Sequence, residues 1–315
     1  MKLTHIALGL GLVLLSGAPG IAQQAPASPA LYASSADVAA LIAKAKNERK
    51  TEPRIGETIL RLDPYSVGLE YRPAVAPASV HLHQAELFYV IDGAATIVTG
   101  GKLVGAHQQN AENLDGTGVE GGATQQITKG DFVFVPENTA HWFSAISQTL
   151  VVMSLHVPRP VDAPQLLGTP PGAVGSKVYA SAADVAALVA KARSIRKEGQ
   201  ANVPQSLLPL PPYSVNVEYR ASVGNATVHV HEAELFYVID GAATLVTGGR
   251  LVNQAKAPAD AENLAGDAID GGKTQQIGKG DFIFVPENTP HWFSAISQTL
   301  VVMSLHAPRP VPAAH

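Results

Sequence analysis

Two short clusters of histidine and glutamate contain the residues of this sequence best suited to chemistry. They lie at positions 81–86 and 229–234, and each has two histidines one residue apart, followed by a glutamate. A Pro-Glu-Asn-Thr segment further along each half leads to one more histidine. Imidazole and carboxylate groups in this combination are ligands for divalent transition metals. The predicted ligands are His81, His83, Glu86 and His141 in the first half and His229, His231, Glu234 and His291 in the second.

The spacing predicts how these ligands converge. Alternation along a strand places His81 and His83 on one face. A two-residue turn at Gln84 and Ala85 would make His83 and Glu86 cross-strand partners, although neither turn residue is the Gly or Asn that tight turns prefer. His141 would arrive from a separate strand. Coordination positions would remain open, as in catalytic rather than structural sites.

The second cluster contains a competing carboxylate. Glu232 lies two residues before Glu234, and either could be the ligand. We favour Glu234, because its counterpart Glu86 has no such rival: position 84 is Gln.

The clusters belong to a tandem repeat with a period of about 150 residues, the length of a whole domain. Residues 87–96 recur unchanged as 235–244, and residues 144–155 recur as 294–305. We therefore expect one domain over residues 30–157, a Pro/Gly-rich linker over 158–176 and a second domain over 177–315.

Each repeat begins with a predicted helix and continues as strands. Ser34-x-x-Asp37 and Ser181-x-x-Asp184 are typical of a capped helix start, and residues 38–45 place apolar side chains on one face. The alternating segment 213–219 predicts a strand, as does the short apolar segment 132–135. The pair Asp92-Gly93 predicts a hairpin turn. The pattern predicts an all-β protein built as sandwiches or small barrels.

Composition limits the location and partners of the protein. The net charge of −4 offers no basic field for nucleic acid, and the absence of cysteine excludes thiolate ligands and disulfides. Residues 1–22 have the charged start, apolar core and small-residue end of a signal peptide. We expect a periplasmic or secreted bacterial protein, with no membrane attachment after cleavage.

These residues resemble the motifs of the cupin family. The first motif, G-x5-H-x-H-x3,4-E-x6-G, is matched at His81, His83, Glu86 and Gly93, and again at His229, His231, Glu234 and Gly241. The second motif is matched at Gly130, Pro136 and His141, and again at Gly280, Pro286 and His291. The gap between histidine and glutamate is one residue shorter than the pattern. Asn138 and Asn288 replace the turn glycine of the second motif, which Asn can do because it tolerates the left-handed conformation.

The resemblance implies a two-domain cupin, or bicupin. Its fold would be two antiparallel jelly-roll barrels, each with an N-terminal helix packed outside. Each domain would bind one divalent transition metal, which could be Mn, Fe, Ni, Cu or Zn, and the chain could form a homodimer.

The resemblance also bears on function. It implies a metal-dependent enzyme of the dioxygenase, lyase or decarboxylase type acting on a small oxygenated substrate. Oxalate decarboxylases resemble one another in an arginine three residues before the first ligand, whereas Ala78 and Ala226 hold that position here. The alternative is a non-enzymatic periplasmic protein that binds a small molecule or metal. No catalytic acid or base can be identified.

Other side chains could line a substrate pocket. The candidates are Trp142, Phe143, Trp292, Phe293, Arg72 and Arg220. Both arginines have a glutamate two residues away and could instead form ion pairs with it. We interpret His156 and His306 as buried, hydrogen-bonded residues at a strand end rather than as ligands. Inserts at 105–122 and 253–272 could form a lid, a dimer arm or a surface loop, and Glu112-Asn113 and Glu262-Asn263 are their candidates for chemistry.

Overall fold

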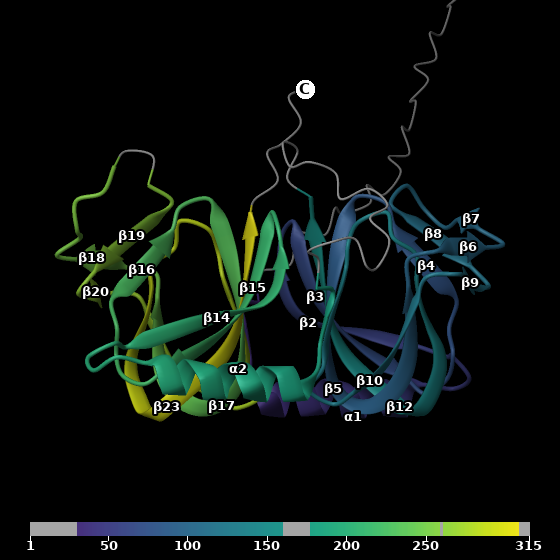
Figure 1. The fold of residues 1–315 in the computed structure, drawn as a ribbon, viewed down its shortest axis with the longest axis horizontal. Coiled ribbons are helices and arrows are strands. Elements are labelled where there is room, and N and C mark those ends of the chain that lie inside the picture. Colours follow the sequence, from purple (N-terminus) through teal and green to yellow (C-terminus); the bar gives the residue numbers. More distant parts are fainter. Residues whose placement is uncertain (1–29, 160–176, 259–260, 309–315) are drawn as a thin grey trace, which may run out of the picture.

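A computed structural model describes residues 30–159, 177–258 and 261–308, which form two similar β-rich halves side by side (Figure 1). The predicted signal peptide and linker residues 160–176 lie outside the described residues. The prediction of an all-β protein with two jelly-roll barrels is confirmed. Neither helix of the described residues is long and apolar enough to cross a membrane.

The first half consists of one helix and a ten-stranded sheet that includes a strand from the second half, together with a small two-stranded sheet. Its elements are β1 (Tyr32–Ala33), α1 (Ser35–Glu48), β2 (Ile55–Leu62), β3 (Tyr65–Arg72), β4 (Ala78–His81), β5 (Gln84–Thr99), β6 (Lys102–Val104), β7 (His107–Gln108), β8 (Asn113–Gly116), β9 (Gly118–Glu120), β10 (Ala123–Thr128), β11 (Phe132–Val135) and β12 (His141–Pro158).

The second half repeats this order, except that its described residues contain no counterpart of β7. Its elements are β13 (Tyr179–Ala180), α2 (Ala182–Ile195), β14 (Asn202–Leu210), β15 (Tyr213–Arg220), β16 (Ala226–His229), β17 (Glu232–Thr247), β18 (Arg250–Val252), β19 (Asn263–Gly266), β20 (Ala268–Asp270), β21 (Lys273–Gly278), β22 (Phe282–Val285) and β23 (His291–Pro308). In both halves two long antiparallel strands, β5 with β12 and β17 with β23, form the spine to which the shorter strands attach.

Both helices begin at the predicted caps and pack on the outside of the strands. The Ser34 side chain accepts a hydrogen bond from the Asp37 backbone, and the Asp37 carboxylate accepts one from the Ser34 backbone. Ser181 and Asp184 form the same capping box. Val38 and Ala45 are buried on the predicted apolar face of α1. The expectation of one external helix per barrel is therefore confirmed.

The expected hairpin at Asp92-Gly93 is wrong. Strand β5 continues through these residues, and its register against β12 shifts there. Gly93 has φ of +86°, and a Cβ at this position would lie 2.0 Å from the Thr149 carbonyl oxygen. Gly93 therefore bends a long strand where the turn residues alone indicated a reversal. Asn138 and Asn288 adopt φ of 54° and 52°, the left-handed conformation expected of them.

The two halves exchange their first strands. β1 precedes the first barrel in sequence but pairs with β22 of the second, and β13 pairs with β11 of the first. A continuous apolar core lies between the halves, where the Tyr89 and Tyr237 hydroxyls are 2.8 Å apart. This exchange joins the two barrels into one structure.

Candidate metal centre

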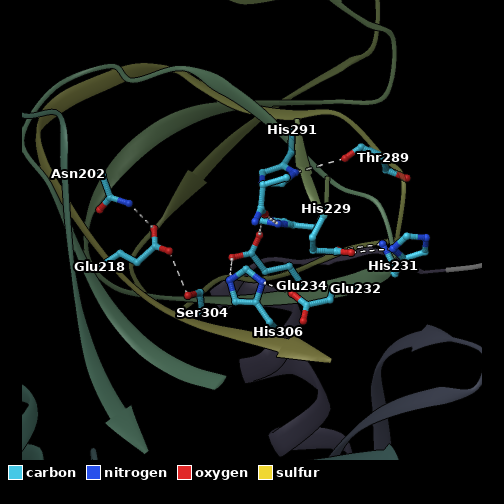
Figure 2. Close-up of polar contacts among 12 residues, drawn as sticks. Asn202, Glu218, His229, His231, Glu232, Glu234, Thr289, His291, Ser304 and His306 are labelled. Carbon is cyan, nitrogen blue, oxygen red and sulfur yellow. Dashed lines mark hydrogen bonds and ion pairs between the residues drawn. The ribbon is translucent and has the colours of Figure 1, made fainter. Parts of the chain in front are cut away.

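Three histidines surround one buried glutamate in each half. In the first, His81 Nε2 and His141 Nε2 lie 3.2 and 3.3 Å from Glu86 Oε2, and His156 Nε2 lies 3.3 Å from Glu86 Oε1. The second half repeats this arrangement, as Figure 2 shows. There the corresponding distances from Glu234 are 3.3, 3.2 and 3.2 Å, to His229, His291 and His306.

Sheet pairing and curvature bring these side chains together. Glu86 on β5 is the register partner of His156, near the end of β12. His141 begins the same strand and pairs with Ser79 of β4, the strand that ends in His81. Because the sheet curls into a barrel, the two ends of β12 approach the same carboxylate.

Hydrogen bonds on the far side of two imidazoles determine which nitrogen faces the glutamate. His81 Nδ1 lies 2.5 Å from Asn113 Oδ1, and His141 Nδ1 lies 3.4 Å from the Thr139 carbonyl oxygen. Both oxygens only accept, so each Nδ1 donates its proton. Nε2 of each ring then faces Glu86 and is the nitrogen available to a cation. His229 with Asn263, and His291 with the Thr289 carbonyl, repeat this pattern.

The glutamates remain ionised despite burial. Burial by itself raises the pKa of Glu86, but His156, His141 and His81 outweigh it and hold the pKa well below its usual value. His229, His291 and His306 likewise hold the pKa of Glu234 well below normal. Each centre therefore offers an ionised carboxylate surrounded by three imidazoles.

The buried carboxylate oxygens provide a test of whether a cation fits. Glu86 Oε2 and Glu234 Oε2 are inaccessible to solvent and accept no well-aligned hydrogen bond within the described chain. Lone pairs on two imidazoles and an anionic oxygen repel one another unless a positive charge lies between them. The ligand atoms of His81, Glu86 and His156 lie within 4.8 Å of one another, as do those of His229, Glu234 and His306. These residues fit a divalent metal with nitrogen and oxygen ligands.

His83 and His231 do not join the clusters. His83 lies in the turn between β4 and β5, with its side chain 66% exposed and its Nδ1 2.9 Å from Glu112 Oε2. His231 is 74% exposed and lies 2.7 Å from Glu262 Oε2. The structure thus corrects the expected convergence of these two histidines with the other ligands.

The error arose from the position of the turn. Gln84 and Ala85 are the first residues of β5, and the turn is at Leu82 and His83. β4 pairs with β8 and β12 rather than with β5, so the expected cross-strand pair of His83 and Glu86 does not form. The chain crosses to a different part of the barrel at this point.

His156 and His306 occupy the places expected for His83 and His231. Sequence reasoning treated them as buried strand-end residues and missed their approach to the glutamates. The available signal was their recurrence beside the unchanged apolar segments 144–155 and 294–305. A histidine retained in both copies of a buried strand indicates a shared role.

The aromatic candidates separate into different environments. Trp142 donates a hydrogen bond to the Ala76 carbonyl and packs with the apolar cluster of Ala78 and Leu103 beside the insert. Phe143 is buried against Phe88, whose ring also neighbours His141. Trp292 likewise bonds the Gly224 carbonyl, and Phe293 packs on Phe236. Each phenylalanine therefore packs on a ring that neighbours a histidine of its centre.

The arginine candidates form ion pairs, buried in the first half and partly buried in the second. Arg72 Nε lies 2.6 Å from Glu70 Oε2, and its guanidinium covers the Phe143 ring at 4.4 Å. Arg220 pairs with Glu218 at 2.6 Å and covers Phe293 at 4.4 Å. Of the two roles expected for these arginines, the structure therefore shows the ion pair with the glutamate two residues away.

The inserts position residues at both centres. Strand β8 pairs with β4 and thereby brings Asn113 to His81 and Glu112 to His83. β19 pairs with β16 and brings Asn263 and Glu262 to the equivalent histidines. These parts of the inserts extend the barrel strands and orient histidines.

Comparison with known proteins agrees with this architecture. Residues 58–177 match the family model described as Cupin. No curated protein matches the chain in sequence.

Solved structures extend the likeness to both halves. Salicylate 1,2-dioxygenase from Pseudaminobacter salicylatoxidans is similar with a TM-score of 0.57 and 13% identity, over 88% of this chain and 84% of that one. Its adducts with gentisate give a TM-score of 0.58 and 12% identity, over 88% and 80%. A cupin 2 conserved barrel domain protein from Leptotrichia buccalis gives 0.48 and 13%, over 83% and 91%. At identities this low, the structural similarity to the dioxygenase shows a shared fold alone.

Proposed function

We propose that the chain, whose residues 58–177 match the cupin family model, is a metal-dependent oxidoreductase of the dioxygenase type that uses its two centres. Its substrate would be a small oxygenated molecule. The observation that supports this proposal is the convergence of three imidazoles on one buried glutamate, two of them on a carboxylate oxygen that has no hydrogen-bond donor.

The surroundings of the first centre favour a small substrate. A cavity of about 300 Å³, lined mainly by β2, β3 and the turn between them, also has Ser154 and His156 in its lining and so touches the first centre at His156. This volume is at the lower end of the range for small-molecule pockets. A compact molecule with oxygen donors fits this space.

The protein contributes ligand geometry and exclusion of water. Glu86 is only 3% exposed, and Ser154 Oγ donates a hydrogen bond of 2.5 Å to its Oε1. Asn113 fixes the proton of His81 on the nitrogen that faces away from the carboxylate. A bound divalent metal would supply Lewis acidity and, if redox-active, a path for electrons to dioxygen.

Two observations support oxidation over decarboxylation of oxalate. Ala78 and Ala226 are fully buried methyl groups at the position of the substrate-gripping arginine of oxalate decarboxylases. The solved structures that share the fold include a salicylate 1,2-dioxygenase. We therefore propose small carboxylic and phenolic compounds as the first substrates to examine.

Metal content tests the foundation of this proposal. Elemental analysis of the purified full chain should find one transition-metal ion for each of the two centres. His81→Ala and His229→Ala should each lose one ion, whereas the matched controls His83→Ala and His231→Ala should keep both. Absence of metal from the unaltered chain, or equal losses in the controls, would contradict the proposed centres.

Oxygen uptake tests the reaction. The metal-loaded chain should consume dioxygen with at least one small carboxylic or phenolic compound, and His81→Ala with His229→Ala together should abolish the uptake. Product formed equally well without air would exclude a dioxygenase. Metal retention without turnover of any compound would favour the alternative, a non-enzymatic small-molecule or metal-binding protein.

We also propose that the protein acts in the periplasm or is secreted. The support is the charge and hydropathy pattern of residues 1–22. Expression of the full chain in a bacterium, followed by mass measurement of the periplasmic fraction, should show removal of this segment. An intact chain confined to the cytoplasm would contradict export.

A further inference from the structure

One sequence difference lies directly beside the two otherwise matching centres. Position 84 in the first half is Gln, and its counterpart in the second half is Glu232. Both residues begin the long strand that carries the central glutamate two residues later. Their side chains therefore project toward the same face as Glu86 and Glu234.

In the second half this difference creates a hydrogen-bonded chain. Glu232 Oε2 lies 3.1 Å from His306 Nδ1, while His306 Nε2 lies 3.2 Å from Glu234 Oε1 (Figure 2). The imidazole is thus held between two carboxylates. Glu232 accepts the Nδ1 proton, orients the ring and leaves Nε2 as the nitrogen directed into the centre.

The first half lacks this support. His156 Nδ1 is buried and has no hydrogen-bond partner among the described residues. Ser154 donates a hydrogen bond of 2.5 Å to Glu86 Oε1, the oxygen that His156 faces. In the second half the equivalent Ser304 turns to Glu218 at 3.1 Å and leaves Glu234 Oε1 to His306. Both differences weaken the donors of the first centre relative to the second.

We infer that the two centres bind metal unequally, with the tighter one in the C-terminal half, and that Glu232 is the positioning residue responsible. The inference rests on the metal binding of the proposed function. A carboxylate on the outer nitrogen of a ligand histidine fixes the ring and strengthens it as a donor, and its loss typically lowers metal affinity about 10- to 100-fold. At limiting metal, the C-terminal centre would fill first.

The experiment measures each centre separately. His81→Ala leaves the C-terminal centre, and His229→Ala leaves the N-terminal one. Zn²⁺ affinity of each variant is measured by competition with a chromophoric chelator, and Co²⁺ absorption reports the coordination. We expect about 10- to 100-fold tighter Zn²⁺ binding by the C-terminal centre.

Reciprocal exchange then assigns the difference to one residue. Glu232→Gln, made in His81→Ala, should remove most of the advantage. Gln84→Glu, made in His229→Ala, should raise the affinity of the N-terminal centre by about 10-fold, a gain that a damaged fold cannot produce. Glu262→Gln serves as the matched control, because Glu262 contacts exposed His231 and not His306. It should leave Zn²⁺ affinity unchanged.

The outcomes separate this inference from the proposed function. Equal affinities, or affinities that respond to neither exchange, would overturn the unequal centres while the metal proposal stands. A loss of affinity in Glu262→Gln as large as in Glu232→Gln would also overturn the assignment. If neither centre binds Zn²⁺ or Co²⁺, the proposed function fails and this inference fails with it.

Discussion

The two halves have the same ligand cluster in different electrostatic surroundings. Arg54 in the first half lies 2.7 Å from Glu70, which also pairs with Arg72. Asn202 takes the place of Arg54 in the second half and donates a hydrogen bond to Glu218. Together with Gln84 and Glu232, these exchanges make the second barrel more acidic near its centre.

This comparison shows what the duplicated fold holds constant and what it allows to vary. The three histidines and the central glutamate keep matching distances in both halves. Some of the contacts around them differ, namely those of Glu232 and of Ser154 against Ser304, and such contacts alter proton and metal affinity without changing the fold. Two sites of common origin can therefore differ in strength while retaining one geometry.

The largest expected effect concerns a feature that the two halves share, the strand bend at Gly93 and at Gly241. Gly93→Ala and Gly241→Ala place a Cβ 2.0 Å from a carbonyl oxygen, at φ of +86°. Each should lower the free energy of unfolding by about 4 kcal/mol or more, the range of severe core disruptions. Urea titration followed by circular dichroism measures this. If one substitution is tolerated, the two bends are not equivalent.

Removal of the central carboxylate should have the next largest effect. Glu86→Gln and Glu234→Gln keep the side-chain volume but remove the charge that faces three imidazoles. Each should weaken metal binding in its own half by about 100-fold or more. This loss should exceed the loss in Glu232→Gln, which removes a hydrogen-bond partner of a ligand and not a ligand itself. Chelator competition measures it, with Glu112→Gln as the control. Loss from both halves after one substitution would show that the centres are coupled.

The pH response of the metal-free chain sharpens the difference between the halves. Burial lowers the pKa of His306, but Glu232 and Glu234 outweigh it and raise the pKa to about 10. Burial lowers the pKa of His156, and Glu86 only partly offsets this. At pH 8 we therefore expect His306 to be protonated and His156 neutral, which NMR of the imidazole protons can show.

The sign of the stability change follows from these shifts. The contribution of His306 is fully present below its unfolded value of 6.5 and is lost as pH rises toward about 10. His156 has the opposite effect, because its lowered pKa costs stability as pH falls below 6.5. Glu232→Gln should reduce the alkaline loss in thermal unfolding of the metal-free chain. An unchanged alkaline profile would contradict this account.

The smallest expected effect concerns the exchange at Arg54. Arg54→Asn makes the first half resemble the second, but the Arg54 side chain is 46% exposed, so we expect a loss of up to about 1 kcal/mol in unfolding free energy. Burial opposes ionisation of Glu70, and Arg72 and Arg54 nevertheless lower its pKa. That stabilisation is present above 4.5 and is lost as pH falls.

Urea unfolding at pH 7 and pH 4 measures this contribution. Arg54→Asn should cost less at pH 4 than at pH 7, because part of the Glu70 stabilisation is already lost there. The reciprocal Asn202→Arg is the matched control in the second half. A larger cost at pH 4 would contradict the pairing with Glu70.

Much of the fold was predictable from local patterns. The repeat, the capping boxes at Ser34 and Ser181, and the alternating strands identified two β-barrels with external helices, because caps and periodicity depend on neighbours in sequence. The continuation of β5 through Asp92-Gly93 was not predictable, because the pairing of β5 with β12 extends the strand past a local turn signal. The exchange of β1 and β13 had no local signal.

The residues of the candidate centre were likewise predicted only in part from local patterns. His81, Glu86 and His141 were predicted from motif spacing and lie together, as do their second-half counterparts. His83 was placed by an assumed turn, whereas the actual turn depends on the pairing of β4 with β8 in the insert. His156 is separated from Glu86 by most of the domain and meets it only through the register of β5 with β12.

The sequence by itself therefore determined the duplication, the chemical types of the ligands and the difference between Gln84 and Glu232. Only the tertiary structure decided that His156 rather than His83 faces Glu86, and that Glu232 supports His306. The physical reason is that residue types and their periodicity are local properties. Strand register and sheet curvature arise from pairing between distant segments, and they select which of several histidines reach a common point.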